Sequence, residues 1–362
     1  MQFIDFKYQK KLNHLHSKNI NKIINKSNFI LGDEVENFEK EFANFSGTKY
    51  AVGTSSGTDA LFLALKTLNI KKGDEVIIPS HTFIATALSA LYTNCEVILC
   101  DIDPNTLLLD LNKLEKTITK KTKAIIPVHL YGMGVDINIL KKIIKHKNIF
   151  IVEDASQAHG LNHYCNNVFK GDLSIFSLYP AKNLGAYGDS GIIITNKKDY
   201  YNKLKKLRNW GGTKKYVHNL IGYNMRMDTL QASILSTKLK KLKKWNDDRR
   251  NIANFYNKNF LKIKKLKIHH NLRKNHVFHL YVLITNYRNK LQKYLEKNNI
   301  PTIIHYPKPI HKHLAFKNKN FFKQTFPVSE KICKNILSIP IYPEMKLSLQ
   351  KKIVKYINKF FK

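Results

Sequence analysis

The sequence predicts an α/β fold in which a mainly parallel, seven-stranded sheet is covered by helices and followed by a smaller α+β domain. Short apolar runs of strand length recur along residues 50–195, and segments with helical spacing of apolar residues separate them. This alternation is typical of a parallel sheet packed between helices. The chain of 362 residues is long enough for one large core and a second, smaller one.

The elements are expected in the following order. The first fifty residues are predicted to be helical with polar faces, to end near the turn at 46–48, and to contribute to the smaller domain or a dimer surface. Strands are predicted at 50–52, 75–78, 96–100, 124–128, 150–153, 173–177 and 191–195. A segment from residue 228 to about residue 260 has helical spacing and a charged outer face, so we interpret it as the connection between domains.

Strand-like residues 276–284 and flanking helical segments then favour a small α+β domain. No internal repeat or linker rich in proline, glycine or serine marks the boundary. We expect it near residue 245, which gives a large domain of residues 1–245, including the N-terminal helical segment, and a small domain of residues 246–362.

Composition narrows the class of protein. No apolar run reaches the ~18 residues of a membrane span, and the N-terminal residues lack a secretory apolar core, so we expect a cytoplasmic protein that does not enter a membrane. The four cysteines show no C-x-x-C spacing and are expected to be packed thiols. His305, His311 and His313 lie close in sequence without an organised acidic or cysteine partner, and no metal site is predicted.

The formal charge of +36 would ordinarily point to a nucleic acid or an anionic surface. Only six of the 62 basic residues are arginines, however, and the lysines are scattered along the chain instead of forming a basic tail. We therefore expect no nucleic-acid partner. The positive field should attract anionic substrates such as nucleotide diphosphates, less strongly at high salt.

Two residues stand at the ends of predicted strands. Asp154 ends the apolar run at 150–153, and Lys182 follows the run at 173–177 and precedes a glycine-rich turn. Ligands in open α/β sheets bind outside the carboxyl ends of the strands, so both side chains are expected to reach one pocket. A lysine that forms a Schiff base, together with an acid on the pyridine nitrogen, is the minimal requirement of pyridoxal phosphate chemistry.

Around these residues the sequence resembles the DegT/DnrJ/StrS family of sugar-nucleotide aminotransferases, which have the fold type I architecture of aspartate aminotransferase. The resemblance extends over most of the chain, and the order of its motifs makes it specific. The motifs are Phe3-Ile4-Asp5, Ile30-Leu31-Gly32, Ser56-Gly57-Thr58-Asp59-Ala60-Leu61, Pro79-Ser80-His81-Thr82-Phe83, Glu153-Asp154, the stretch 177–189 around Lys182, Gly222-Tyr223-Asn224-Met225-Arg226 and His305-Tyr306-Pro307.

The resemblance implies a set of cofactor-binding residues. Gly57 and Thr58, at the start of a predicted helix, would hold the phosphate of pyridoxal 5′-phosphate. Phe83 would stack on the pyridine ring, Gln157 would lie near the phenolic oxygen, and Ser177 would bind the phosphate through its hydroxyl.

Asp154 would keep the ring nitrogen protonated, and Lys182 would act as nucleophile and general base. Some members are dehydratases with His in place of this lysine, so Lys182 favours transamination. Asn224 resembles a residue that reaches the phosphate in the neighbouring subunit, which implies a homodimer with shared active sites.

The substrate-binding residues implied by the resemblance are His159, Arg226, His305 and Tyr306. His159, His305 and Tyr306 are similar to the corresponding residues of members that act on 3-keto sugar nucleotides, whereas Arg226 taken alone is equally compatible with an ordinary ion pair. The chain departs from the family pattern at Ser190, where a glycine is usual, and at 161–167, where a hairpin is expected.

The sequence thus favours an aminotransferase that uses an amino-acid donor, glutamate, to aminate the C3 keto group of a nucleotide-linked hexose, for a deoxyamino sugar of a surface polysaccharide. Two alternatives remain open. The same chemistry could act on a 4-keto or uronic-acid sugar nucleotide, or the chain could be a DNA-binding regulator without catalytic activity. Two observations argue against the regulator: Lys182 and Asp154 are both present, and the sequence lacks a recognisable helix-turn-helix or zinc-finger pattern.

Overall fold

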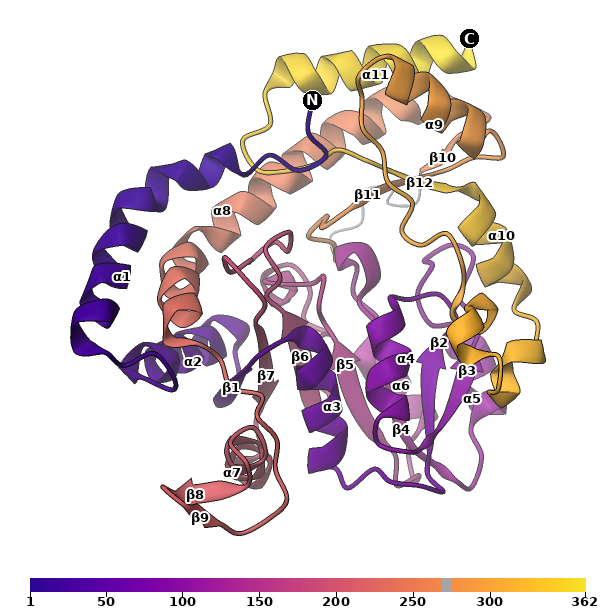
Figure 1. Cartoon of the computed structure of the whole chain (residues 1–362). Coiled ribbons are helices and arrows are strands. Elements are labelled where there is room, and N and C mark those ends of the chain that lie inside the picture. Colours follow the sequence, from indigo (N-terminus) through magenta and orange to yellow (C-terminus); the bar gives the residue numbers. More distant parts are fainter. Residues whose placement is uncertain (269–274) are drawn as a thin grey trace.

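The computed structural model describes residues 1–268 and 275–362. Its centre is a seven-stranded sheet with the strand order β1-β7-β6-β5-β4-β2-β3 (Figure 1). β7 runs antiparallel to both of its neighbours, and the other strands are parallel to one another. The strands are β1 (Tyr50–Thr54), β2 (Glu75–Pro79), β3 (Glu96–Cys100), β4 (Thr122–Ile125), β5 (Phe150–Asp154), β6 (Leu173–Ser177) and β7 (Gly191–Thr195).

Helices cover both faces of this sheet, and the alternation of side chains along the strands decides which helix meets which face. Val76 and Ile78 of β2 belong to the core formed with α3, α4 and α7, whereas Ile77 between them belongs to the core formed with α5 and α6. The helices are α3 (Gly57–Thr67), α4 (Ile84–Leu91), α5 (Leu111–Thr117), α6 (Ile137–Ile143) and α7 (Lys198–Leu207).

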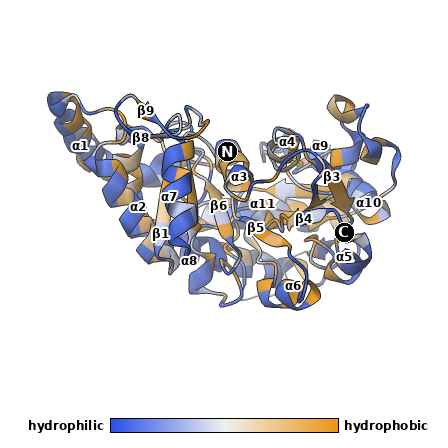
Figure 2. Ribbon diagram, turned by 90° about the horizontal axis from the view of Figure 1, so that it is seen from below, coloured by the Kyte–Doolittle hydropathy of each residue, from blue (hydrophilic) through white to orange (hydrophobic). Residues whose placement is uncertain are grey.

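The N-terminal residues form the 3-10 segment Phe6–Leu12 and helices α1 (Asn13–Lys26) and α2 (Asp33–Ser46). Apolar residues of α2, such as Phe38 and Phe42, pack with α8 and one face of β1 and β7, so α2 belongs to the large core and not to the small one. Figure 2 shows the hydrophilic faces of α1, α2 and α7 at the outside of the molecule. The predicted helical start is therefore confirmed: α2 packs on the sheet, whereas α1 packs along α8.

α8 (Thr229–Phe260) is one continuous helix that carries two cores. Leu235 and Leu239 near its start pack in the core of the large sheet, and Tyr256 and Phe260 near its end pack in a second core. The predicted boundary at residue 245 falls inside this helix, and the division into domains of residues 1–245 and 246–362 stays a prediction.

The second core lies around a three-stranded antiparallel sheet with the order β10-β11-β12. Its strands are β10 (Lys267–Ile268), β11 (Tyr281–Ile284) and β12 (Ile336–Ile339), and its helices are α9 (Arg288–Lys297) and α11 (Leu347–Phe361), while α10 (Pro327–Asn335) precedes β12. Further 3-10 segments are Leu130–Gly132, Leu161–His163, Ile310–Lys312, Leu314–Phe316 and Asn320–Lys323. A small hairpin of β8 (Gly212–Lys214) and β9 (Val217–His218) extends away from the sheet (Figure 1).

β1, β2 and β5 end one or two residues later than predicted, and two other predicted strands differ more in their bounds. The strand expected at 124–128 is β4 (Thr122–Ile125), which begins and ends earlier, and the run at 276–284 becomes a strand only from Tyr281. The amide of Val277 binds the carbonyl of Gly132 and that of Leu280 binds the carbonyl of Tyr131, so this segment is held by a loop of the large sheet before β11 begins. In the described ranges, no helix combines the length and apolar character needed to cross a membrane.

Candidate active site

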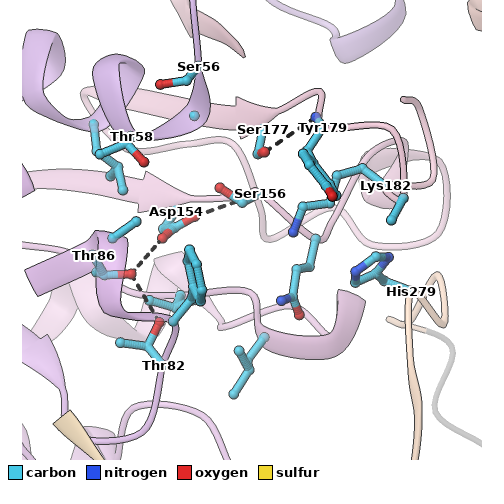
Figure 3. Close-up of a pocket in the computed structure, with 18 of the residues that line it drawn as sticks. Ser56, Thr58, Thr82, Thr86, Asp154, Ser156, Ser177, Tyr179, Lys182 and His279 are labelled. Atoms are coloured by element: carbon cyan, nitrogen blue, oxygen red, sulfur yellow. Dashed lines mark hydrogen bonds between the residues drawn. The ribbon is translucent and has the colours of Figure 1, made fainter. Parts of the chain in front are cut away.

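A cavity lies at the carboxyl ends of β5 and β6, beside the N-termini of α3 and α4 (Figure 3). This edge of the sheet is where ligands of open α/β folds bind. The cavity brings together predicted site residues from distant parts of the chain. Those that line it are Gly57, Thr58, Phe83, Asp154, Gln157, Ser177, Lys182, His305 and Tyr306.

Lys182 lies in a compact turn that follows β6. Its amide donates to the carbonyl oxygen of Tyr179 (2.9 Å), and the amide of Ala186 closes the turn on Leu178 (2.8 Å). Gly185 is required in this turn, because a Cβ there would lie 2.3 Å from the carbonyl oxygen of Pro180. The sequence Ala-Lys-Asn-Leu-Gly thus presents the lysine side chain to the cavity.

The amine of Lys182 is free to react. In residues 1–268 and 275–362, its Nζ has no hydrogen-bond partner. Burial lowers the pKa of Lys182 from its usual value to about 8, although the charge of Asp154 acts in the opposite direction. The lowered pKa increases the fraction of Lys182 that is an unprotonated nucleophile near neutral pH.

Asp154 ends β5 with a carboxylate that is only 4% exposed. Thr86 Oγ1 donates to one carboxylate oxygen (2.9 Å), and the amide of Ser156 donates to the other (3.1 Å). Thr82 lies 3.0 Å from the Thr86 hydroxyl and extends the chain of hydrogen bonds, as Figure 3 shows. These contacts fix the direction in which Asp154 faces the cavity.

The start of α3 lines the same cavity as Lys182 and Asp154. The first amides of a helix have no carbonyl partner within it and favour an anion. Ser56 caps the helix by accepting from the amide of Asp59 (3.0 Å), which leaves the amides of Gly57 and Thr58 beside the cavity. A Cβ on Gly57 would lie 2.6 Å from Cβ of Ser177, so only glycine allows the close approach of α3 and β6.

Gln157, which follows β5, and Tyr306, from the C-terminal part of the chain, are hydrogen-bonded to each other in the cavity wall. Gln157 donates from Nε2 to the hydroxyl of Tyr306 (3.1 Å), and its Oε1 accepts from the amide of Tyr131 (2.6 Å). The ring of Tyr306 lies 5.5 Å from that of Phe83, which is 52% exposed and therefore open to a planar ligand.

His305 also lines the cavity. Burial, followed by the charge of Lys182, lowers the pKa of His305 to about 4, so this imidazole is neutral.

Three predicted residues do not line this cavity. His159 is fully buried, and its Nε2 donates to the carbonyl oxygen of Ser177 (2.9 Å), so it supports the wall from behind. Asn224 is exposed and accepts from Nε of Arg226 (3.1 Å). The Arg226 guanidinium lies 4.1 Å from the ring centre of Trp210, next to the β8–β9 hairpin.

The cavity also contains polar residues that the sequence did not single out. Thr82, Thr86 and Ser156 surround Asp154, and His279 lies near Lys182 (Figure 3). Thr82 and Thr86 carried a usable signal, since they stand one helical turn apart just after a strand. His279 carried none, because it lies almost a hundred residues after Lys182.

The fold and these side chains together define a class of protein, the fold type I enzymes that use pyridoxal phosphate. The residues present fit that cofactor, since a free amine, an oriented carboxylate and a glycine-only helix start surround one cavity. The chain belongs to the DegT/DnrJ/EryC1/StrS aminotransferase family, whose model matches residues 10–358. It is accordingly an aminotransferase with pyridoxal phosphate as its cofactor.

Similar proteins span nearly the whole chain. A dTDP-3-amino-3,6-dideoxy-alpha-D-galactopyranose transaminase of Aneurinibacillus thermoaerophilus is 40% identical over 361 residues, which are 99% of this chain and 97% of that protein. A pleiotropic regulatory protein of Geobacillus stearothermophilus is 37% identical over 350 residues, which are 95% of this chain and 93% of that protein.

Solved structures agree with the fold. DesV of S. venezuelae, in complex with a ketimine intermediate, has a TM-score of 0.96 at 34% identity, and the match covers 100% of this chain and 98% of that one. NtdA of Bacillus subtilis, with bound cofactor PMP, has a TM-score of 0.92 at 27% identity, and the match covers 99% of this chain and 83% of that one.

Another lysine, Lys238, supports the Lys182 turn on the side away from the cavity. Lys238 of α8 is fully buried, its Nζ donates to the carbonyl oxygen of Gly185 (2.7 Å), and the same atom lies 3.9 Å from the ring centre of Tyr187. Tyr187 in turn contacts Nδ1 of His16 through its hydroxyl (3.0 Å). Burial lowers the pKa of Lys238 to about 7.

This lysine predicts a pH dependence of stability. The pKa of Lys238 is about 7 in the folded protein and ~10.4 in the unfolded chain. Between these values the unfolded chain binds more protons, so the free energy of unfolding rises with pH through the window, and the cost of the buried charge is complete below pH 7.

Lys238→Met removes the group, so the variant should gain less stability than the wild type between pH 7 and 10, by on the order of a few kcal/mol. Chemical unfolding at pH 6.5 and 9.5 measures this difference. The exposed Lys240→Met on the same helix is the matched control. Equal pH slopes for the two variants would show that the pKa of Lys238 is not lowered.

Proposed function

We propose that this aminotransferase moves an amino group from L-glutamate to the keto carbon of a nucleotide-linked hexose, at C3 of a dTDP-3-keto-6-deoxyhexose. The observation that carries the proposal is the single cavity in which the Lys182 amine faces the Asp154 carboxylate beside the start of α3. The 40% identity to a dTDP-3-amino sugar transaminase supports the substrate.

The residues divide the work as follows. When bound, the cofactor supplies an electron sink for the carbon that carries the amine. Asp154, fixed by Thr86, holds a proton at the ring nitrogen, and Lys182 takes and returns the proton at the reacting carbon. Gly57, Thr58 and Ser177 would hold the phosphate, a role that the glycine-only contact between α3 and β6 supports.

Phe83 would cover the cofactor ring, and Gln157, which Tyr131 and Tyr306 hold in place, would lie near its phenolic oxygen. We assign His305 and Tyr306 to the sugar nucleotide, because both line the cavity beside Lys182. His159 acts on the substrate only through Ser177, whose carbonyl it holds. A nucleotide-linked substrate also suits the strongly positive chain.

We further propose a homodimer in which Asn224 and Arg226 serve the neighbouring subunit's site. Both lie outside the cavity of their own chain. The β8–β9 hairpin and the segment that follows it expose apolar side chains, with Tyr216 at 85% and Ile221 at 89% exposure. The reaction belongs to the cytoplasm, where nucleotide sugars are made, and its product would enter a deoxyamino sugar of a surface polysaccharide such as an O-antigen.

Subunit mixing tests the shared site. Asn224→Ala and Lys182→Ala should each be inactive alone, because one lacks the neighbouring contact and the other the nucleophile. In a mixed dimer, Lys182 of one subunit meets Asn224 of the other, and about a quarter of the wild-type activity should return. No recovery after confirmed subunit exchange would assign Asn224 to its own chain or to no site.

A substrate panel tests the reaction itself. The purified holoenzyme should convert a dTDP-3-keto-6-deoxyhexose with glutamate faster than 4-keto or uronic-acid sugar nucleotides. Faster conversion of either of the latter would move the assignment to that sugar. The name of the Geobacillus relative and the positive charge favour a regulator as the second candidate. Binding of duplex DNA at physiological salt, with no turnover of any sugar nucleotide, would support it.

A further inference from the structure

His279 is an unassigned side chain in the active-site cavity. It precedes β11, is 6% exposed, and lies near Lys182 (Figure 3). His305 lines the same cavity. Its carbonyl oxygen accepts from the buried guanidinium of Arg249 (3.3 Å), so its backbone is held in place. None of the roles described above uses its imidazole.

The hydrogen bonds of Asn183 fix the tautomer of His279. The amide nitrogen of Asn183 donates to Oδ1 of Asn246 (2.8 Å) and to the carbonyl oxygen of Val277 (3.2 Å). The orientation of the Asn246 amide is also fixed, because its nitrogen donates to the carbonyl oxygen of His159 (2.8 Å), which leaves Oδ1 to accept from Asn183. Oδ1 of Asn183 is therefore the atom that faces Nδ1 of His279 (3.1 Å), and Nδ1 must carry the proton.

The remaining nitrogen, Nε2, is an acceptor. Burial, followed by the charges of Lys182 and Arg249, lowers the pKa of His279 well below its usual value, so the ring is neutral and Nε2 carries a lone pair. Nε2 has no hydrogen-bond partner among the described residues. It is also not one of the solvent-inaccessible polar atoms that lack a partner. A fixed acceptor thus faces the cavity close to the reacting amine.

We propose that Nε2 of His279 accepts a hydrogen bond from the sugar hydroxyl next to the reacting carbon, which makes His279 a specificity residue for the sugar nucleotide. This inference rests on the proposed function. Lys182 moves the proton at the reacting carbon, so this carbon must lie close to Nζ. The hydroxyl on the adjacent carbon is the hydrogen-bond donor that the hexose brings there. The amino-acid donor brings a carboxylate instead, which a lone pair repels.

Two substitutions separate the two nitrogens of the ring. In His279→Asn, the amide nitrogen ends near the position of Nδ1 and can still donate to Asn183, but nothing replaces Nε2. In His279→Gln, the longer side chain can place its oxygen near the position of Nε2 and restore an acceptor. His313→Asn, outside the cavity, is the matched control.

Because the overall reaction has two half-reactions, each substrate can be tested separately. Single-turnover absorbance measurements of the holoenzyme with a dTDP-3-amino sugar should show a loss of about ten- to hundredfold for His279→Asn and a smaller loss for His279→Gln. The half-reaction with glutamate should stay within about twofold of the wild type for both variants. Calorimetry with the cofactor-free protein should show weaker binding of the same amino sugar nucleotide to His279→Asn.

An equal loss in both half-reactions would assign His279 to Lys182 or to the cofactor and overturn the proposal. An unchanged sugar half-reaction in His279→Asn would also overturn it. Melting temperatures and cofactor retention identify a variant that merely folds poorly, and His279→Gln then carries the test. If the wild type itself converts no sugar nucleotide, the proposed function has failed, and that outcome is distinct from the failure of His279.

Discussion

Lys182→Ala should abolish transamination, with a loss of kcat on the order of 10⁵-fold, because the variant lacks both the nucleophile and the group that moves the proton. The wild type should retain pyridoxal phosphate through dialysis, and borohydride should fix the cofactor to the peptide that contains Lys182. The variant should lose most of the cofactor and show no such fixation. Mass spectrometry of the reduced, digested protein measures this.

The exposed Lys240→Ala is the control, and it should behave like the wild type. Lys238 is the alternative that the experiment must exclude, since its pKa is also lowered, to about 7. Its amine is directed at the carbonyl of Gly185 behind the turn. Fixation of the cofactor to Lys238 in the wild type would contradict the assignment of Lys182.

Asp154→Asn should lower kcat by roughly 10²–10³-fold, as expected when a preorganised, buried charge is removed from an active site. The amide keeps the size of the carboxylate and can still bond to Thr86, but it no longer holds the ring nitrogen in its protonated form. Steady-state kinetics with saturating cofactor measure this loss, and Asp199→Asn on the surface of α7 is the control.

The same substitution has an independent electrostatic readout. The charge of Asp154 raises the pKa of Lys182 against the effect of burial, which brings it to about 8. Removal of that charge should therefore lower the pKa of Lys182 further in the cofactor-free protein. NMR titration of the labelled lysine follows this directly, and an unchanged pKa would mean that the two groups do not interact.

The sheet was predictable from the sequence because its strands are short apolar runs bounded by turns. All of the strands predicted between residues 50 and 195 occur. Asp154 ends β5 and Lys182 lies in the turn that follows β6, so both positions follow from the predicted strands. The bounds were less accurate where the chain leaves the sheet. Apolar residues 126–128 continue the run after β4 ends, since buried loops and strands share the same composition.

The cavity wall was only partly predictable. The family resemblance implied Gly57, Phe83 and Gln157, and all three line the cavity, although their roles stay predictions. His159 follows Asp154 closely in sequence, yet the turn after β5 directs it to the carbonyl of Ser177 and away from the cavity. A sequence pattern gives no information on which side of a turn a side chain leaves.

By itself, the sequence determined the α/β class, the order of the strands along the chain and the pair of Lys182 and Asp154, because these depend on residue type and spacing over short stretches. Only the tertiary structure decided that α8 carries two cores, that Lys238 supports the Lys182 turn and that His279 enters the cavity. Those features depend on contacts between residues far apart in the chain. Packing determines these contacts, and no short sequence pattern predicts them.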